Sequence, residues 1–367
     1  MDIRLIDSNF IQHSVQGCDF HVYDLPDWML EGFPWEKENQ KRFCRLPDSI
    51  LPQLNQPNEG AELISVEGLS KMSAGGVLRF CTDSNALLLQ GHYRPFGLMP
   101  HMPLTGQAGF DVTVLENGRE RLLCNLKPET QAIFSKDFAF EFSCELCGTM
   151  NEYRIYLPLY AGLESLEIGL VPNSELKPAP PHKVSKPILF YGSSITQGGC
   201  ASRPSNCHCA LTARWLDAQQ INLGFSGNAK GRTCVAEAIA NLPLSCFVMD
   251  YDHNAMTVER LQNTHEAFFQ IIRKAQPKLP VVFVSRPQSI IGEYENTVKR
   301  RDVILNTYLR AKNNGDRYVY FVDGMKFFDE IDREAGTVDL LHPNDLGFYL
   351  MAKQIVPVVK EALEQMR

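Results

Sequence analysis

The sequence predicts an α/β domain preceded by an all-β sandwich. Residues 61–170 contain several short strand patterns with turn signals between them, which is typical of a sandwich. From residue 188 onward, strand and helix patterns alternate, and this order predicts a parallel sheet covered by helices on both faces. Five prolines in residues 171–187 separate the two regions and indicate a semi-rigid linker. We therefore predict a sandwich domain over residues 1–170 and an α/β domain over residues 188–367.

Composition and charge exclude several classes of protein. The 367 residues are 44% hydrophobic and 22% charged with a net charge of −7, which is an ordinary globular balance and argues against a nucleic-acid partner. No run of 18 apolar residues occurs, so we expect no transmembrane helix and no membrane partner. Met1–Asp7 lacks the basic and apolar regions of a signal peptide, which predicts a cytoplasmic protein. A secreted or periplasmic chain whose signal had been removed would look the same.

The first domain is expected to contain loops followed by short strands. Residues 1 to about 60 are irregular, with proline- and aromatic-rich loops at Asp24–Trp28 and Gly32–Trp35. Asn117-Gly118 lies between two strand patterns and predicts a hairpin. The strand patterns of this domain cover Val77–Thr82, Ala86–Gln90, Phe110–Leu115, Arg121–Cys124, Phe138–Phe142 and Tyr153–Leu157.

The second domain alternates five strand patterns with helical ones. The predicted strands are Ile188–Tyr191, Ile221–Phe225, Cys246–Tyr251, Val281–Val284 and Tyr318–Val322. The predicted helices include Val258–Ala275, Tyr294–Ala311 and Phe348–Met366. Because the carboxyl ends of parallel strands meet at one edge of the sheet, we expect the loops after these strands to hold the functional residues.

A candidate nucleophile follows the first of these strands. The apolar run Pro187–Tyr191 ends in Gly192-Ser193-Ser194, and a helical pattern resumes near Ser205. A small-residue turn after a strand can hold one hydroxyl at the carboxyl edge of the sheet. Ser194 is that hydroxyl in our interpretation. The structural alternative is that it only caps the following helix.

A candidate base and its partner lie before the last helix. A serine hydroxyl is a poor nucleophile unless a base stands beside it, and His342 can be that base. Asp339 precedes it by three residues, so in a turn its carboxylate can reach the imidazole Nδ1 and fix the tautomer. The alternative is that His342, before Pro343, merely caps the last helix.

Candidate oxyanion donors follow the second and third strands. A tetrahedral intermediate needs preorganised hydrogen-bond donors. The backbone N–H of Gly227, the side-chain amide of Asn254 and the backbone N–H of Ser194 are suitable. The alternatives are a hinge role for Gly227 and a turn role for Asn254.

These four segments, in this order, resemble the SGNH (GDSL-type) hydrolase superfamily. The resemblance covers about residues 185–367, and Asp-x-x-His-Pro-Asn near the C-terminus is its strongest block. It implies a flavodoxin-like three-layer α/β/α domain and ester hydrolysis through a serine acyl-enzyme. It also implies the following roles: nucleophile Ser194, oxyanion donors Gly227 and Asn254, acid Asp339 and base His342.

The sequence departs from the family pattern in two blocks. The aspartate that usually precedes the nucleophile is Ser193 here. The usual Gly-x-Asn-Asp block reads Asp252-His253-Asn254-Ala255. Neither change removes a catalytic group, but both concern the geometry of the oxyanion hole.

The N-terminal half resembles the β-sandwich, jelly-roll-like in our prediction, that precedes the SGNH domain in a bacterial two-domain subfamily. The match is looser, because the subfamily's Gly-x-Asp-Leu-Tyr becomes Gly109-Phe-Asp-Val-Thr113. The subfamily includes esterases and acyltransferases. The matching segments are Trp35, Phe43–Pro47, Ser73–Gly75, Pro100–Met102 and Gly109–Thr113.

Four further residues are candidates for substrate binding, each with a structural alternative. Arg286 follows the fourth strand and could instead form a salt bridge. His253 could line the pocket or be structural. His101 and Arg94 of the sandwich domain could reach over the site, since the loop 94–105 is rich in proline, methionine and glycine and suits a covering loop.

Eleven cysteines are more than a chain of this length needs for stability. Cys144 and Cys147 have zinc-knuckle spacing without a second pair. A denser group follows Ser194, and we interpret it as reduced, mostly buried thiols rather than a metal site. Its members are Cys200, Cys207, His208 and Cys209.

The predicted function is that of a serine carboxyl-ester hydrolase that removes acetyl or other short acyl groups from a small-molecule or carbohydrate ester. No metal or organic cofactor is expected. One alternative is an acyltransferase that uses the same acyl-enzyme. The other is a catalytically inactive glycan-binding protein, in which the sandwich would be the active part.

Overall fold

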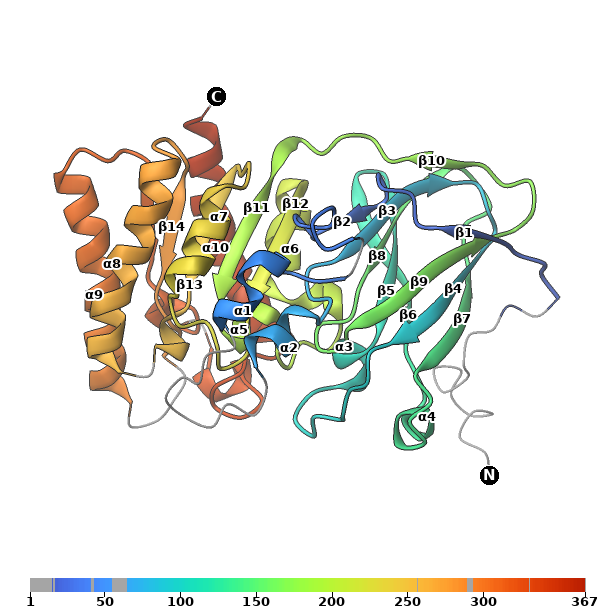
Figure 1. The fold of residues 1–367 in the computed structure, drawn as a ribbon, viewed down its shortest axis with the longest axis horizontal. Coiled ribbons are helices and arrows are strands. Elements are labelled where there is room, and N and C mark those ends of the chain that lie inside the picture. Colours follow the sequence, from blue (N-terminus) through green and yellow to red (C-terminus); the bar gives the residue numbers. More distant parts are fainter. Residues whose placement is uncertain are drawn as a thin grey trace.

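The computed structural model confirms an all-β region followed by an α/β domain (Figure 1). It describes residues 15, 17–40, 43–54, 65–255, 257–288, 293–329 and 331–366. The Met1–Asp7 stretch, on which the expectation about export rests, lies outside the described residues.

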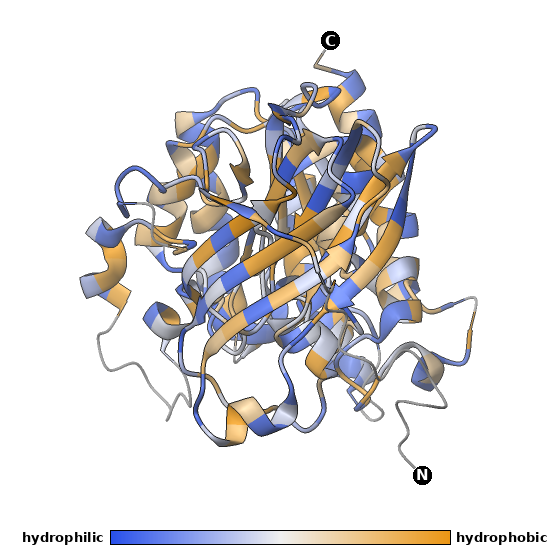
Figure 2. Cartoon of the chain, turned by 90° about the vertical axis from the view of Figure 1, so that its right-hand side faces the viewer, coloured by the Kyte–Doolittle hydropathy of each residue, from blue (hydrophilic) through white to orange (hydrophobic). Residues whose placement is uncertain are grey.

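Two antiparallel sheets form the β-region. One has the strand order β1-β9-β4-β7, and the other has the order β10-β3-β8-β5-β6, with β2 paired to β3. Apolar and polar residues alternate along these strands (Figure 2), as expected for sheets with one buried face. The strands are β1 (His21–Asp24), β2 (Leu30–Glu31), β3 (Val77–Thr82), β4 (Ala86–Tyr93), β5 (Phe110–Glu116), β6 (Arg119–Leu126), β7 (Ala139–Glu145), β8 (Asn151–Tyr156), β9 (Leu163–Leu170) and β10 (Leu176–Pro178).

The predicted hairpin is confirmed between β5 and β6. Asn117 and Gly118 have φ angles of 51° and 74°, and Glu116 pairs with Arg119 across the turn. Two consecutive positive φ angles are what a tight two-residue hairpin turn requires, and Asn-Gly is the pair that adopts them most easily.

The second domain contains one parallel sheet of order β12-β11-β13-β14-β15. In chain order this is 2-1-3-4-5, the flavodoxin-like arrangement, whose ligand site lies at the carboxyl edge where the strand order reverses. In this sheet the strand order reverses at β11, so the site is expected at the carboxyl ends of β11 and of its neighbours β12 and β13. The strands are β11 (Val184–Gly192), β12 (Ala218–Gly224), β13 (Cys246–Asp250), β14 (Val281–Val284) and β15 (Val319–Val322).

Helices cover both faces of this sheet. Leu189 and Tyr191 of β11 pack in one apolar cluster with Phe268 of α8, whereas Ile188 and Phe190 pack on the opposite face with Phe348 of α10. This alternation explains the continuous apolar run, because both faces of the strand are buried. The helices are α5 (Ser194–Gln197), α6 (His208–Leu216), α7 (Thr233–Ala240), α8 (Val258–Ala275), α9 (Tyr294–Asn313) and α10 (Asp345–Glu364).

The two regions are joined more closely than the sequence indicates. The proline-rich segment contains β10, which pairs with β3, and the first residues of β11. Apolar side chains of α1 (Leu51–Leu54) and α2 (Val66–Ser70) belong to the core of the α/β domain, not to that of the sandwich. We propose that the domain boundary lies within residues 171–187. In this division α1 and α2 belong to the N-terminal part of the chain but pack on the second domain.

Candidate active site

The turn after β11 requires a glycine. A Cβ at Gly192 would lie 2.0 Å from the Thr196 hydroxyl and 2.2 Å from the carbonyl oxygen of Asp250. Ser193 then accepts a hydrogen bond of 3.2 Å from the N–H of Ile195 and caps α5, as an aspartate can do in the same position. The serine that stands in place of the family's aspartate therefore still caps the helix, and Ser194 is the first residue of α5.

The structure brings Ser194, His342 and Asp339 into one hydrogen-bonded chain. The Oγ of Ser194 lies 2.9 Å from Nε2 of His342, and Nδ1 of His342 lies 2.7 Å from Oδ2 of Asp339. Burial raises the pKa of Asp339, but hydrogen bonds from the backbone and ring of His342 outweigh it, so the net shift is downward. The carboxylate is therefore ionised and accepts the Nδ1 proton, which leaves the Nε2 lone pair toward Ser194.

Gly227 and Asn254 lie on loops that are tied to α5 and to each other. The N–H of Ser226 donates to Oε1 of Gln197 in α5 at 3.1 Å, and the N–H of Ala229 donates to Oδ1 of Asn254 at 3.2 Å. The second bond makes Nδ2 the end of the Asn254 amide that can donate to a substrate. Gly227 has a φ of 70°, a conformation that glycine adopts without strain.

Arg45, which was not among the candidates from the sequence, holds the end of β12 that leads into the Gly227 loop. Its buried guanidinium donates to the carbonyl oxygens of Asn222 and Gly224 at 3.0 and 2.7 Å. It also donates to the carbonyls of Leu69 and Met72 at 2.6 and 2.8 Å. Burial lowers its pKa to about 10. The signal in the sequence is an arginine inside an apolar block, but two of its partners, Asn222 and Gly224, are 177 and 179 residues away.

The N-terminal domain also contacts the turn that carries Ser194. The Tyr160 hydroxyl donates to the carbonyl oxygen of Ser194 at 3.2 Å. The buried carboxylate of Asp111, the acidic residue of the Gly-x-Asp block, lies 3.0 Å from Nη1 of Arg203 and accepts from the N–H of Ser205 at 2.9 Å. This block therefore fixes the segment that follows α5.

Two of the four substrate-binding candidates lie near the chain of three residues. The ring of His101 lies 5.7 Å from that of His342, so the loop 94–105 reaches the site as expected. His253 is partly exposed, but its Nε2 is buried and has no hydrogen-bond partner in the structure. Burial, with the nearby charge of Arg286, lowers its pKa well below the usual value. An imidazole with a lowered pKa is a weak base, which argues against a role as a second base.

The other two candidates differ in their partners. The guanidinium of Arg286 donates to the hydroxyl of Thr297 at 2.7 Å and lies 3.4 Å from Glu293, as in the salt-bridge alternative. These contacts hold Arg286 in place without a substrate. The backbone N–H of Arg94 donates to the carbonyl of Gly162, but the buried Nε of its guanidinium has no hydrogen-bond partner in the structure.

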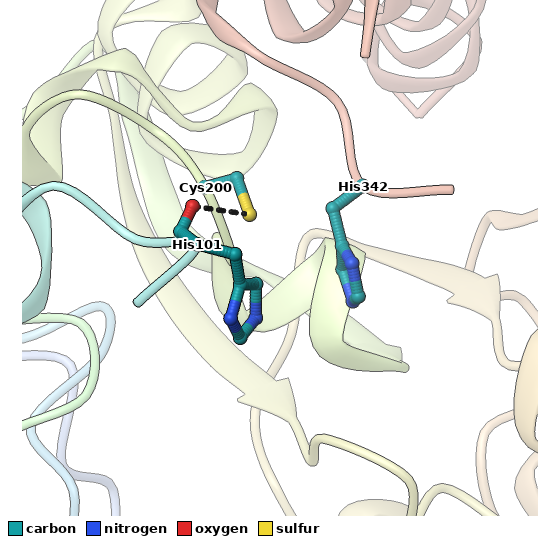
Figure 3. A group of neighbouring side chains, drawn as sticks. All are labelled: His101, Cys200 and His342. Atoms are coloured by element: carbon teal, nitrogen blue, oxygen red, sulfur yellow. Dashed lines mark hydrogen bonds between the residues drawn. The ribbon is translucent and has the colours of Figure 1, made fainter. Parts of the chain in front are cut away.

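The cysteine group after Ser194 is divided in the structure. The thiols of Cys207 and Cys209 donate to the carbonyl oxygens of Pro204 and Thr196, each at 3.4 Å. His208 stacks on Phe348, and burial lowers its pKa to about 3. Cys200 instead lies beside His101 and His342 (Figure 3), where burial and the charge of Asp339 raise its pKa to about 12.

We expect that Cys207→Ser leaves the zinc content of the protein unchanged. Its thiol is engaged with a backbone carbonyl and does not converge with Cys200. The measurement is metal analysis of wild type and variant purified in parallel. One zinc per chain that disappears in the variant would contradict this expectation.

A hollow of about 860 Å³ lies on the sandwich, away from Ser194. Its lining is acidic and includes Asp24, Glu141 and Glu167. Its lining includes His92 but none of Ser194, His342 and Asp339. The candidate active site is therefore the edge of the parallel sheet and not this hollow.

The fold and the Ser–His–Asp arrangement are those of a hydrolase built on a flavodoxin-like sheet. Residues 185–360 match the model of the GDSL-like lipase/acylhydrolase family, and residues 20–176 match that of the N-terminus of SGNH-hydrolase-type esterases. The chain therefore belongs to the SGNH (GDSL-like) hydrolases, in the form that carries this N-terminal domain, and is an ester-hydrolysing enzyme.

Solved structures extend the similarity over nearly the whole chain. A Bacteroides ovatus protein assigned as a GDSL-like lipase is 26% identical, with a TM-score of 0.81 over 94% of this chain and 98% of that one. A salicylyl-acyltransferase from a tetracycline biosynthetic pathway is 19% identical, with a TM-score of 0.69 over 96% of each chain. A family two carbohydrate esterase from Clostridium thermocellum, in complex with cellohexaose, is 15% identical, with a TM-score of 0.56 over 79% of this chain and 93% of that one.

No curated protein matches the sequence significantly. Within the part of the chain that the structure describes, no helix has both the length and the apolar character needed to cross a membrane.

Proposed function

We propose that this protein is a serine carboxyl-ester hydrolase that works through an acyl-enzyme and removes acetyl or other short acyl groups, with carbohydrate esters as substrates. The observation that carries the proposal is the hydrogen-bonded chain from Ser194 through His342 to Asp339. A hydroxyl, a base and an orienting carboxylate in this order are the parts that nucleophilic acyl transfer needs.

The reaction follows from this geometry. The Ser194 oxygen attacks the ester carbonyl while Nε2 of His342 takes its proton. The tetrahedral intermediate collapses, and the imidazolium returns the proton to the departing alcohol. Water then attacks the acyl-enzyme with His342 again as base, and the carboxylic acid leaves. Asp339 stabilises the imidazolium in both halves without accepting the proton.

The negative oxygen of each intermediate is stabilised by the N–H groups of Ser194 and Gly227 and by Nδ2 of Asn254. The loop bonds from Ser226 and Ala229 support this assignment, because they hold the donors in place before the substrate arrives. Preorganised donors of this kind lower the barrier most effectively.

We expect Asn254→Ala to reduce turnover by about 10²–10³-fold, the usual effect of losing one oxyanion donor. The measurement is kcat on a p-nitrophenyl acyl ester. Asn228→Ala is the control, because this asparagine lies in the neighbouring loop after β12, where its side chain donates to the carbonyl of Ser226, and has no proposed catalytic role. A similar loss in both variants would indicate a general disturbance of the loop and contradict the oxyanion role.

The acyl group and the alcohol are proposed from similarity to other proteins. The carbohydrate part rests on the likeness in fold to carbohydrate esterases and on the presence of a sandwich domain. An alcohol in place of water could also attack the acyl-enzyme, which would form a new ester and release the Ser194 hydroxyl, and a salicylyl-acyltransferase shares the fold.

A screen of p-nitrophenyl esters of increasing acyl length, followed by acetylated sugars, tests the proposal. We expect the highest kcat/KM for acetyl or another short chain and release of acetate from acetylated sugars. Parallel reactions with added alcohols detect transfer as a new ester. If a fluorophosphonate probe did not label Ser194 and no ester were cleaved, the protein would be a binding protein and the proposal would be wrong.

A further inference from the structure

Three side chains from distant parts of the sequence converge at the edge of the proposed active site. His101 comes from the loop 94–105 of the N-terminal domain, Cys200 from the segment after α5, and His342 from the turn before α10 (Figure 3). Their ligand atoms all lie within 4.8 Å of one another. In the described part of the chain, this is the one group of three such side chains close enough to hold a metal ion.

We propose that His101, Cys200 and His342 form a binding site for Zn²⁺ and that an ion bound there inhibits the hydrolase. Two imidazoles and a thiolate are preferred zinc ligands, and water can take the fourth position. The inhibitory part of the proposal rests on the function proposed above, whereas the binding part does not.

The orientation of His342 fits metal binding. Its Nδ1 is bonded to Asp339 at 2.7 Å, so Nε2 is the nitrogen available to an ion. A zinc-bound histidine usually donates the N–H of its other ring nitrogen to a carboxylate or a carbonyl. Zinc at Nε2 would replace the hydrogen bond from Ser194, and the nucleophile would lose its base.

The other two ligands differ in how much they must move. Cys200 is buried and has a φ of 71°, so a non-glycine residue in the left-handed region holds the thiol at this edge. Tetrahedral ligand atoms at 2.0–2.3 Å from zinc are about 3.2–3.7 Å apart, so the group must contract by about 1 Å. The exposed side chain of His101 can supply this movement. On binding, the Cys200 thiol releases its proton to water.

The test measures zinc binding directly. Reduced, metal-free protein is titrated with ZnCl₂ by calorimetry, and we expect one equivalent to bind. Cys200→Ser and His101→Ala should each weaken binding by about 100-fold or more, because even the loss of a group that only hydrogen-bonds to a metal ligand costs about 10–100-fold. Cys147→Ser and His92→Ala are the matched controls on exposed side chains of the sandwich, and they should bind as wild type does.

A second measurement addresses inhibition. Zinc should slow fluorophosphonate labelling of Ser194 and ester hydrolysis, and EDTA should restore both. Each variant is compared with its own zinc-free rate, and thermal melting checks that it is folded. No zinc binding, or binding unaffected in both ligand variants, would overturn the inference. Binding that needs Cys200 and His101 in a protein with no turnover would support the site and overturn only the proposed function.

Discussion

Replacement of Ser194 by alanine is expected to abolish ester turnover. Without the hydroxyl no acyl-enzyme can form, and loss of the nucleophile in a serine hydrolase typically costs about 10⁶-fold in kcat. The fold should be unaffected, because the Oγ bonds to Nε2 of His342, whereas the cap of α5 comes from Ser193. The measurement is single-turnover acylation by a p-nitrophenyl ester, with labelling by a fluorophosphonate probe.

The neighbouring serine provides a matched control. Ser193→Ala removes a hydroxyl one residue away and should cost about 1 kcal/mol of stability through the lost cap. It should still acylate and label. If Ser194→Ala kept near-wild-type acylation while Ser193→Ala lost it, the assignment of the nucleophile would be wrong.

Most of the sheet architecture follows from local patterns. Val77–Thr82, Val281–Val284 and Val258–Ala275 have the predicted bounds, because apolar periodicity and turn residues change together at their ends. β9 (Leu163–Leu170) was missed, since its apolar positions are interrupted by Glu164-Ser165 and by Gly169. Its place between β1 and β4 depends on partners far along the chain.

In the proposed site, too, the contacts within one turn could be predicted and those between distant segments could not. The spacing of Asp339 and His342 predicts contact within one turn, and the structure has them hydrogen-bonded. His101 was a candidate because its loop suits a covering role, and its ring lies 5.7 Å from that of His342. The contacts of Arg45 and the position of Cys200 beside His101 could not be predicted, because they depend on how the N-terminal domain packs on the sheet edge. A buried arginine shows in a sequence only as a polar residue in apolar surroundings, without an indication of its partners.

His342→Ala should be nearly as damaging as Ser194→Ala, whereas Asp339→Ala should retain about 10- to 100-fold more activity than His342→Ala. That gap corresponds to roughly 1.4–2.7 kcal/mol in the barrier. The base transfers a proton in every step, but the carboxylate only orients and stabilises it. Single-turnover acylation of the three variants under identical conditions measures the difference.

The turn around His342 explains why the ring should stay partly in place without the carboxylate. The N–H of Val338 donates to the carbonyl of His342 at 2.9 Å, and the Asn344 side chain caps α10 by accepting from Gly347. However, Oδ1 of Asp339 also accepts from the N–H groups of Leu341 and His342, at 3.1 and 2.7 Å. Asp339→Ala therefore removes both a ring contact and a turn contact.

Asp339→Asn separates these two contributions. The asparagine keeps an oxygen for the backbone N–H groups but can place an NH₂ against Nδ1, which favours the tautomer with the proton on Nε2. That tautomer cannot accept the Ser194 proton, so we expect Asp339→Asn to lose at least as much activity as Asp339→Ala, in which water can reach Nδ1. Suppose that the activity of Asp339→Ala fell as far as that of His342→Ala while Asp339→Asn stayed near wild type. The main role of Asp339 would then be to hold the turn through the N–H groups of Leu341 and His342. The local backbone would then not suffice to orient the base.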